Sequence, residues 1–471
     1  MFLSELKELT DISDSIEAEP EIRFFSDDEA HELYDTFIHL MECYVEDHPK
    51  AITEPNFLET FEEDIFDLLY IHFDDDPFFN DEATDEMNEI FDKAMDDFFK
   101  HYYPMRSHPS NDVHTPVNKE AVKERIAYLQ TIPQPVQRTK EWYEFRHGLI
   151  TASNAYKAFE SQVIKNQLIY EKCQPLQQSE ESEPESEDEL SETEEAENDT
   201  KQIIIQEVKM VNINTTLHWG QKYEPLSVKL YEQRNKCQVG EFGCIPHQKY
   251  SFLGASPDGI ILDETSDKYG RMLEIKNIVN REINGIPKKE YWVQMQLQME
   301  VCDLDYCDFL ETRFNEYNGY DDFKEDHTPE NKGVILYFHK PDGSPFYVYK
   351  ILDPSDYDKL DELEEWEQQK ISEIETQNGI LWIKNYYWKL DQLSCVLVER
   401  NRKWFADNIW ELQELWDTIL RERVTGYAHR APVKKIKRDQ QQTTDKPPTG
   451  CLLNINKVTG KVGLNIIKID I

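Results

Sequence analysis

The stretch "GASPDGIILDETSDKYGRMLEIKN", residues 254–277, decides how the chain is interpreted. It sets Asp258 in a Pro-Gly turn, a short distance before Glu274 and Lys276 on an apolar strand. Because side chains alternate along a strand, Glu274 and Lys276 lie on the same face. A carboxylate beside an ammonium on a strand that otherwise looks buried indicates either a metal site for hydrolysis or an ion pair on a partly exposed edge strand.

The spacing of Glu274 and Lys276 is not specific by itself. The same acid-x-Lys pattern recurs elsewhere in the chain, at Glu5/Lys7, Glu207/Lys209, Asp322/Lys324 and Glu330/Lys332. What distinguishes residues 274–276 is their apolar setting, between Leu273, Ile275 and Ile278. The setting, and not the spacing, therefore carries the metal-site hypothesis.

The metal-site hypothesis assigns a role to each of the three polar residues. Carboxylate oxygens and water are the ligands that Mg²⁺ prefers, so Asp258 and Glu274 are expected to hold Mg²⁺, with Mn²⁺ as a substitute. The metal would lower the pKa of a bound water and neutralise charge on a scissile phosphate. Lys276 would orient the attacking hydroxide or stabilise the charge that develops on the phosphate. The turn at 257–259 would aim Asp258 at Glu274.

Two helical stretches add further polar candidates. In "GQKYEP", Glu224 is predicted near a helix start because Pro225 is tolerated only in the first turn. Glu224 is then either a third carboxylate for the metal or its water, or an acid favoured by the helix dipole. In "YWVQMQLQMEV", Gln294 and Gln298 fall on one helical face. An amide there would position water or phosphate, unless that face is simply half-exposed.

The stretch "EWYEFRHGLITASNAYKAF" is a candidate phosphate site. Gly148 is predicted to end one helix, and Ser153 stands where an N-cap would begin the next. Free N–H groups at a helix start, a hydroxyl and the nearby Arg146 suit a phosphate. A plain N-cap and a surface arginine are the alternative.

Five stretches in this order resemble one family: "EFRHGLITASN", "WGQKYEP", "GASPDG", "LEIKN" and "YWVQMQLQMEV". They look like the lambda-exonuclease, or YqaJ-type viral recombinase, branch of the PD-(D/E)xK nucleases. The resemblance spans about 138–355 of the sequence. It implies an α/β (α+β) restriction-endonuclease-like core, with a central mixed sheet flanked by helices, and Mg²⁺-dependent degradation of duplex DNA in the 5′→3′ direction. The long extensions and the acidic insert look like those of large DNA viruses.

The resemblance also implies roles residue by residue. It carries over Lys276, Glu274, Asp258 and Gln294 as catalytic residues and Asp258, Glu274 and Glu224 as the metal set; Arg146, Ser153 and Ser256 would bind DNA phosphate. The insert between Ser153 and Glu224 is longer than the family core needs. A large acidic N-terminal region would also obstruct assembly into a ring around DNA.

The charge of the chain is concentrated in two segments. The net charge is −43, but residues 1–100 hold 32 acidic and 5 basic residues, and residues 179–199 hold 12 acidic and no basic ones. These two segments carry −39 of the total, so the remainder is nearly neutral. The overall charge therefore does not exclude a DNA-binding face.

Composition shifts divide the chain into five parts. Residues 1–105 are predicted to form an acidic helical region and 106–118 a linker. The nuclease core is predicted at 119–378, with a disordered acidic insert at about 175–200. A Trp-rich helical extension is expected at 379–425 and a basic tail with a short hairpin at 426–471.

Two kinds of partner are predicted. Double-stranded DNA ends are the expected substrate, with a single-strand annealing protein as a candidate partner of the nuclease. A protein partner for residues 1–105 and a homo-oligomer are further candidates. The basic cluster at 434–438 is a candidate DNA contact or nuclear signal.

The expected location is intracellular and soluble. No stretch approaches the roughly 18 apolar residues of a membrane span, and the first residues have no secretion-signal pattern. The eight scattered cysteines are expected to be reduced. A viral protein of this kind would act in the host cytoplasm or be packaged in the virion.

Three rival functions remain open. The first is a structure-selective endonuclease on the same fold. The second is a catalytically silent protein that binds DNA or a partner, and the third is an acidic DNA mimic built from residues 1–105. Asp258, Glu274, Lys276 and Glu224 are all present, which argues against a decayed site.

Overall fold

The computed structural model groups Met1–Arg430 into one compact unit and Ala431–Ile471 into a second. The described residues are 23–73, 81–109, 118–137, 139–176, 212–213, 215–376, 379–432, 453–455 and 462–464. Residues 177–200, which hold most of the predicted acidic insert, and the basic cluster at 434–438 lie outside them.

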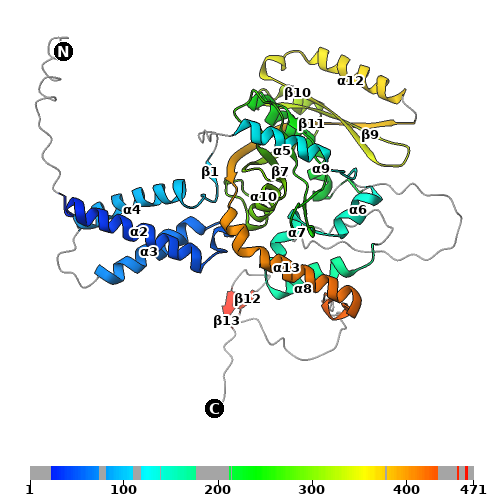
Figure 1. Ribbon diagram of the computed structural model, residues 1–471. Helices are drawn as coiled ribbons and strands as arrows, with labels where there is room; N and C mark the ends of the chain where they lie inside the picture. Colours follow the sequence, from blue (N-terminus) through cyan, green and yellow to red (C-terminus); the bar gives the residue numbers. More distant parts are fainter. Residues whose placement is uncertain are drawn as a thin grey trace, which may run out of the picture. The chain divides into compact units, whose positions relative to one another are not determined.

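Three helices form the acidic N-terminal region, as predicted. They are α2 (Asp27–Asp47), α3 (Phe57–Phe73) and α4 (Asp81–His101), drawn in blue in Figure 1. A capping box starts α2, because the Ser26 side chain accepts from the Glu29 N–H while the Glu29 carboxylate accepts from the Ser26 N–H. Phe37, Phe61 and Phe91 fill the space between the helices and are almost wholly buried. Apolar residues three and four apart thus provide the inner faces, and acidic residues the outer ones.

The N-terminal helices share a hydrophobic core with the rest of the unit. One cluster of buried side chains runs from Phe37 and Phe61 to Trp292 and Trp404. Arg106, predicted to lie in a linker, is 2% exposed, and its guanidinium donates to the carbonyl of Ile52 at 3.1 Å. The strand β1 (His108–Pro109) pairs with the main sheet. The predicted linker at 106–118 is therefore wrong for residues 106–109, because they pack into the core.

The centre of the unit is a mixed sheet of eight strands (Figure 1). Along the sheet the order is β10-β9-β11-β8-β7-β6-β3, with β1 also paired to β11. Only β7 and β8 run parallel; the other neighbouring pairs are antiparallel. The strands are β3 (Val239–Gly240), β6 (Gly259–Ile261), β7 (Met272–Asn277), β8 (Tyr306–Glu316), β9 (Lys332–His339), β10 (Pro345–Leu352) and β11 (Leu381–Glu399). The predicted mixed sheet flanked by helices is confirmed.

The strand β11 corrects the predicted helical extension at 379–425. Its 19 residues pair with β9 over one half and with β8 over the other. The sequence misleads because a strand with neighbours on both sides and side chains packed on both faces lacks clean alternation. Two register shifts, at Trp382/Lys384 and Leu390/Gln392, disturb the pattern further. The helical prediction holds only for α13 (Arg402–Thr425), where Trp404 and Trp416 are buried and Trp410 is exposed.

Helices cover the two faces of the sheet. α9 (Thr216–Asn235) packs on β7 and β8, and its Tyr223, Leu226 and Leu230 share a cluster with Ile335 of β9. On the other face of β9, Val334 clusters with Leu360 and Leu363 of α12 (Leu360–Glu375). Alternate residues of one strand therefore meet different helices.

A smaller sheet lies beside the catalytic candidates. It has the order β2-β5-β4, from Ile150–Thr151, Leu253–Ala255 and Ile245–Pro246. α10 (Lys289–Cys302) packs against β5, α7 (Ala152–Ala155) and α13. The other helices are α5 (Lys119–Thr131), α6 (Lys140–His147), α8 (Gln162–Cys173), α11 (Tyr320–Glu325) and the short turns η1 (Ala51–Thr53), η2 (Tyr156–Phe159), η3 (Pro354–Asp356) and η4 (Ala428–Arg430).

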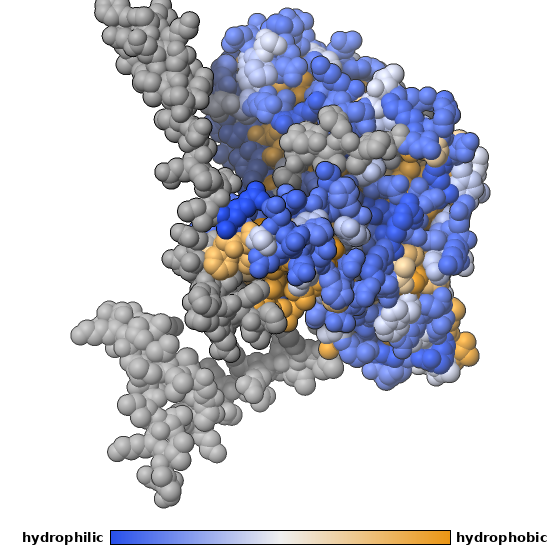
Figure 2. Space-filling model, turned by 60° about the vertical axis from the view of Figure 1, so that its left-hand side comes forward, coloured by the Kyte–Doolittle hydropathy of each residue, from blue (hydrophilic) through white to orange (hydrophobic). Residues whose placement is uncertain are grey.

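The face of the protein drawn in Figure 2 is mostly hydrophilic, with separate hydrophobic patches. The seven cysteines in the described part of the chain are free thiols. Within that part, no helix has the length and apolar character needed to cross a membrane. In the second unit, β12 (Leu453–Ile455) and β13 (Val462–Leu464) pair antiparallel, in the part of the tail where a hairpin was predicted.

Candidate active site

Glu274 and Lys276 lie on β7, between β8 and β6 in the main sheet. Glu274 is fully buried, whereas the Lys276 side chain keeps 24% of its surface exposed. The Lys276 ammonium donates to Glu274 Oε1 at 2.6 Å. β7 pairs with β8 from Met272 to Asn277 and with β6 at Met272 and Leu273. The full burial of Glu274 favours the metal-site hypothesis over a partly exposed ion pair on an edge strand.

The turn before β6 brings Asp258 to Glu274. Asp258 Oδ2 accepts from the backbone N–H of Ile275 at 2.7 Å. The next residue, Gly259, pairs with Leu273 in the ladder between β6 and β7. A Cβ at Gly259 would come within 2.2 Å of Val239 Cγ1, so the close approach of β3 requires glycine here. The sequence Pro-Asp-Gly thus fixes Asp258 against the strand that carries Glu274.

The electrostatics of these side chains are those of a crowded carboxylate site. Burial, together with the negative charges of Glu274 and Glu224, raises the pKa of Asp258 well above its usual range. Burial alone would lower the pKa of Lys276, but the carboxylates of Glu274 and Asp258 outweigh it and raise that pKa above the ordinary lysine value. Lys276 is therefore a cation. Its single positive charge does not balance the carboxylates of Asp258, Glu274 and Glu224.

Glu224 is close enough to act on Asp258, but it does not stand at a helix start. α9 begins at the N-cap Thr215, whose hydroxyl accepts from the His218 N–H at 3.1 Å. Pro225 is therefore inside the helix, and the prediction that it marks the first turn is wrong. The proline removes one helical hydrogen bond, a cost that the tertiary contacts of α9 outweigh.

A polar network ties α9 to β7 beside Glu224. The Asn277 side-chain amide donates to the carbonyl of Gly220 at 3.1 Å. Asn277 Oδ1 accepts from the hydroxyls of Ser227 at 2.7 Å and Thr312 at 2.8 Å. These bonds fix the position of α9 relative to the end of β7. Asn277 directly follows the Glu-x-Lys motif, but the spacing alone gives no sign of this role.

On α10, Gln298 contacts the site directly. It is fully buried and donates through Nε2 to Glu274 Oε2 at 2.7 Å, and to the carbonyl of Ser256 at 3.3 Å. Gln298 Oε1 is buried without a hydrogen-bond partner among the described residues. Gln294 lies one turn earlier and is half-buried. The shared helical face was predicted, but sequence reasoning chose Gln294 and missed Gln298 as the residue that holds Glu274.

The candidate phosphate site has a different helix start from the predicted one. Gly148 ends α6, as expected, but the N-cap of α7 is Thr151 and not Ser153. The reason is that Ile150 and Thr151 pair as β2 with β5, so the helix can begin only after them. Ser153 is exposed, and its hydroxyl lies 3.1 Å from that of Thr151. α7 has only four residues, which leaves little helix dipole for a phosphate.

Arg146 and Ser256 lie in one neighbourhood. The Arg146 guanidinium stacks over the Trp142 ring at 4.2 Å. Burial raises the pKa of the Cys244 thiol, while a hydrogen bond with Ser256 and the charge of Arg146 act against that rise. Ser256 is in turn linked through its carbonyl to Gln298. The structure thus connects Ser256 to the carboxylate site, and both Ser256 and Arg146 act on the Cys244 thiol.

Three residues around Lys276 were missed from the sequence. The Lys276 ammonium lies 4.8 Å from the centre of the Tyr291 ring, and the Arg281 guanidinium lies 5.5 Å from it. Arg281 also pairs with the fully buried Glu311, which faces Lys276 across β7 and β8. They come from three separate elements, so no local motif could have grouped them.

The donor set of this site suits a hard cation. In the part of the chain that the structure describes, no three Asp, Glu, His or Cys side chains converge at metal-binding distance. The carboxylates of Asp258 and Glu274 are close enough for the charge of Glu274 to raise the pKa of Asp258. Mg²⁺ is commonly held by one or two carboxylates, with water or phosphate oxygens completing its shell. Oxygen donors alone, with the raised pKa of Asp258, fit Mg²⁺ or Mn²⁺ better than a thiolate-seeking metal.

Comparison with known proteins finds a family model that matches the segment containing the candidate site. Residues 141–305 match the YqaJ-like viral recombinase domain. The resemblance to YqaJ-like recombinases is confirmed over this segment. It contains Arg146, Ser153, Glu224, Ser256, Asp258, Glu274, Lys276 and Gln294.

Two known proteins have further similarity to the chain. An uncharacterized protein of Acanthamoeba polyphaga mimivirus is 28% identical over 334 residues, which is 63% of this chain and 54% of the relative. The chain thus spans about half the length of that protein. An alkaline exonuclease of Laribacter hongkongensis is 18% identical, with a TM-score of 0.31. This match covers 60% of the present chain and 94% of the exonuclease chain. A structure of the same exonuclease with dAMP has a TM-score of 0.32, with equal identity and coverage.

Proposed function

We propose that this chain is a Mg²⁺-dependent DNA exonuclease of the lambda type, which degrades duplex DNA in the 5′→3′ direction during viral DNA recombination or repair. One observation carries the proposal. Within the segment that matches the YqaJ-like domain, a buried carboxylate, Glu274, lies between the Lys276 ammonium and the Gln298 amide, with Asp258 beside it. A buried carboxylate with a buried neighbour of like charge is costly unless a cation joins them.

In this proposal Asp258 and Glu274 hold the cation, which would supply a water of lowered pKa and neutralise charge on the phosphate. Lys276 keeps its proton and donates to the phosphate oxygens as their charge grows. For this it must turn from Glu274 Oε1, which its partly exposed side chain allows. Gln298 keeps the Glu274 carboxylate oriented through Oε2 while Oε1 changes partner.

The other predicted site residues receive supporting roles. Glu224 is proposed to hold a water of the metal, because its charge reaches Asp258. Gln294 is proposed to face the substrate one turn from Gln298. Arg146 and Ser153 are proposed to bind DNA phosphate, with Ser256 beside them.

Two alternatives lead to different outcomes. A structure-selective endonuclease on the same fold would use the same residues without needing a DNA end. A catalytically silent protein that binds DNA or a partner would need none of them, although Asp258, Glu274 and Lys276 are assembled around one another. Mn²⁺ as a substitute cofactor, a single-strand annealing partner, a partner for residues 1–105, a homo-oligomer and a place in the host cytoplasm or virion remain predictions.

The test compares linear duplex DNA, phosphorylated at one 5′ end only, with covalently closed circular DNA of the same sequence. We expect Mg²⁺-dependent loss of the linear DNA from the phosphorylated end, and no cleavage of the closed circle. Cleavage of the circle would favour the endonuclease. Cleavage of neither DNA, and of no nicked or branched form, would contradict the enzymatic proposal.

A further inference from the structure

A cavity of about 290 Å³ opens beyond the end of β7, where Val279 lines it. It lies between the first turns of α9 and the strand β11, and we call it the α9–β11 cavity. Its lining includes Thr216, Trp219, Lys222, Glu316, Lys384 and Tyr386. This volume is at the low end for small-molecule sites, so it suits one flat group and not a base pair.

The cavity is joined to the catalytic centre through α9 and β7. Trp219 and Glu224 are five residues apart on α9, which is about 7.5 Å along the helix axis. Val279, two residues beyond the end of β7, also lines the cavity, and Lys276 is three residues before it. Asn277 holds the two elements together through the Gly220 carbonyl. A nucleotide next to a phosphate at Lys276 is therefore within reach of the cavity.

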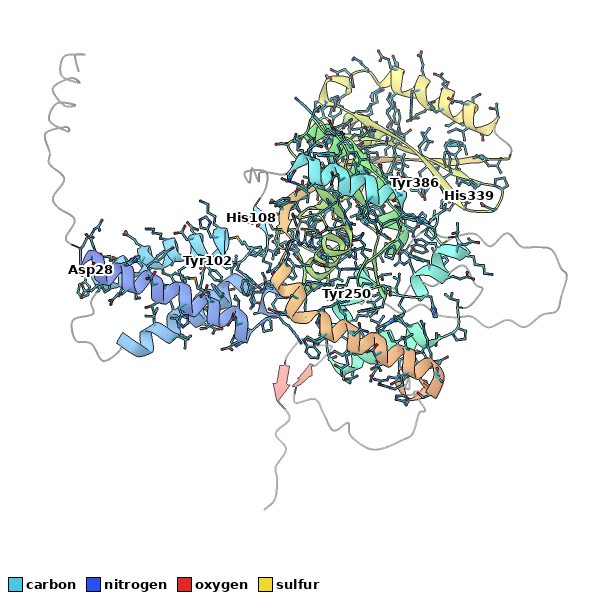
Figure 3. The ribbon with its side chains drawn as sticks, in the orientation of Figure 1. Asp28, Tyr102, His108, Tyr250, His339 and Tyr386 are labelled. Atoms are coloured by element: carbon cyan, nitrogen blue, oxygen red, sulfur yellow. The ribbon has the colours of Figure 1, made fainter. Side chains whose placement is uncertain are left out.

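Aromatic rings and cations alternate in the cavity. The buried Lys222 ammonium lies 4.7 Å from the centre of the Trp219 ring and 4.2 Å from that of Tyr386. The exposed Lys384 lies 4.2 Å from the Tyr386 ring. The Tyr386 ring contacts the ring of Tyr337 on β9, which in turn contacts His339 at the end of β9. Figure 3 labels Tyr386 and His339 on this part of the sheet.

The polar groups of the cavity also favour an occupant. Glu316 accepts from Lys222 and, at 2.8 Å, from the Tyr223 hydroxyl, so it is fixed in place as an acceptor. The Trp219 indole N–H is buried without a hydrogen-bond acceptor among the described residues. A buried donor of this kind is stabilised by a ligand acceptor. Lys222 and Lys384 are close enough for the charge of Lys384 to act on Lys222, an arrangement that an anion would relieve.

We propose that the α9–β11 cavity takes one unpaired nucleobase of the DNA strand next to the catalytic centre. The base stacks on Trp219 and Tyr386 in place of the Lys222 and Lys384 ammoniums. Lys222 keeps its bond to Glu316, Lys384 moves to the adjoining phosphate, and the Trp219 N–H donates to an acceptor of the nucleotide. Stacking on aromatic side chains tolerates any base, which suits an enzyme without sequence preference. This inference rests on the proposed function for the position of the strand, but it concerns binding, which can be measured without cleavage.

The experiment measures binding of a fluorescein-labelled single-stranded oligothymidine 12-mer to the full chain by fluorescence anisotropy, in EDTA. Trp219→Ala is expected to weaken binding about 5- to 100-fold, because one stacked base is lost. Trp219→Phe keeps a ring face and is expected to stay within about 3-fold of the wild type. Trp410→Ala, at a tryptophan that is 59% exposed on α13, is the matched control and should bind like the wild type. Lys384→Ala should lower the slope of log affinity against log salt by about 1.

Three results would overturn the inference: wild-type affinity in Trp219→Ala, equal losses in Trp219→Phe and Trp219→Ala, or the same loss on a blunt hairpin duplex as on the single strand. Near-UV circular dichroism of each variant shows whether it is folded. If the wild type cuts no DNA but the Trp219 effect on binding is seen, the proposed function fails and the cavity assignment stands. If the wild type cuts DNA and Trp219→Ala binds normally, the cavity assignment fails and the proposed function stands.

Discussion

At the scale of single residues, the carboxylate chemistry of the site follows from local sequence. Asp258 is fixed by the Pro-Asp-Gly turn and by the Ile275 N–H, and Glu274 by the alternation of an apolar strand. Both features are contained in a short stretch, which is why they could be predicted. Gln298 could not be singled out, because its helix presents two glutamines on one face and only the packing of α10 on β5 decides which one meets Glu274.

The residue Asp258 is predicted to be required for cation binding. In the wild type, 10 mM Mg²⁺ should raise the Tm by roughly 1–3 °C, because a cation that binds only the folded state stabilises it. Asp258→Asn should abolish this rise. Asp267→Asn, at an exposed position in the loop before β7, should keep it. The measurement is thermal unfolding with Mg²⁺ and with EDTA.

The folding of the Asp258→Asn variant has its own expectation. Burial and the neighbouring carboxylates raise the pKa of Asp258, so the metal-free folded state disfavours its charge. Without metal at neutral pH, Asp258→Asn should therefore unfold at the same temperature as the wild type or higher. A persistent Mg²⁺ effect in this stable variant would contradict the metal assignment.

At the scale of elements, a strand with a clear apolar pattern could be predicted from the sequence. A strand with helices packed on both of its faces could not. β7 is a short apolar run bounded by polar loops, and the structure has this strand where the sequence predicts it. The sequence of β11 lacks the alternation of a strand because α9 packs on one face of the sheet around β11 and α12 on the other. Apolar residues of β11 therefore occupy both of its faces. α9 was expected to start near Pro225 because helix propensity does not include the packing that keeps the helix intact across the proline.

The contact between α12 and β11 is predicted to depend on pH through Glu367. This residue is 7% exposed, and its Oε2 accepts from Asn385 Nδ2 at 2.9 Å and from the Tyr387 hydroxyl at 3.2 Å. Burial raises the pKa of Glu367 to about 7. A carboxyl whose pKa is higher in the folded state stabilises that state fully below its unfolded pKa of about 4.3 and loses the contribution as pH rises to 7.

Between pH 5 and pH 8, titration of Glu367 should lower the free energy of unfolding by on the order of 2 kcal/mol. Glu367→Gln keeps an acceptor for Asn385 and Tyr387 without a charge, so its stability should change less over this range. Glu365→Gln, at an exposed position on the same helix, should retain the wild-type dependence. Denaturant unfolding at both pH values measures the difference, and parallel behaviour of wild type and Glu367→Gln would exclude Glu367 as its cause.

At the scale of the whole molecule, the acidic N-terminal helices belong to the same unit as the proposed nuclease core. Beyond the shared apolar cluster, Trp292 Nε1 donates to the carbonyl of Arg106 at 2.9 Å, and Lys289 of α10 pairs with Glu54 at 2.9 Å. The sequence showed the helices and their charge. It did not show this docking, because contacts between residues 1–105 and 289–416 have no local signature.

The shared core predicts joint unfolding of the two regions. Phe61 of α3 is fully buried, so Phe61→Ala should cost about 3–5 kcal/mol. All nine tryptophans lie after residue 105, so tryptophan fluorescence follows only the rest of the chain. We expect Phe61→Ala to lower the Tm recorded by that fluorescence. Leu68→Ala, 53% exposed on the same helix, should leave it unchanged; an unchanged fluorescence transition in Phe61→Ala would show that the helices unfold separately.

The measurement that tests the central claim most directly is the rate of nucleotide release from linear duplex DNA by wild type, Lys276→Ala and Lys324→Ala, with Mg²⁺ and with EDTA. Lys324 stands in the same acid-x-Lys spacing after Asp322, but on the exposed surface of α11. We predict Mg²⁺-dependent release by the wild type and Lys324→Ala, and a loss of at least about 100-fold in Lys276→Ala. Release at equal rates by Lys276→Ala and the wild type, or release that persists in EDTA, would contradict the account.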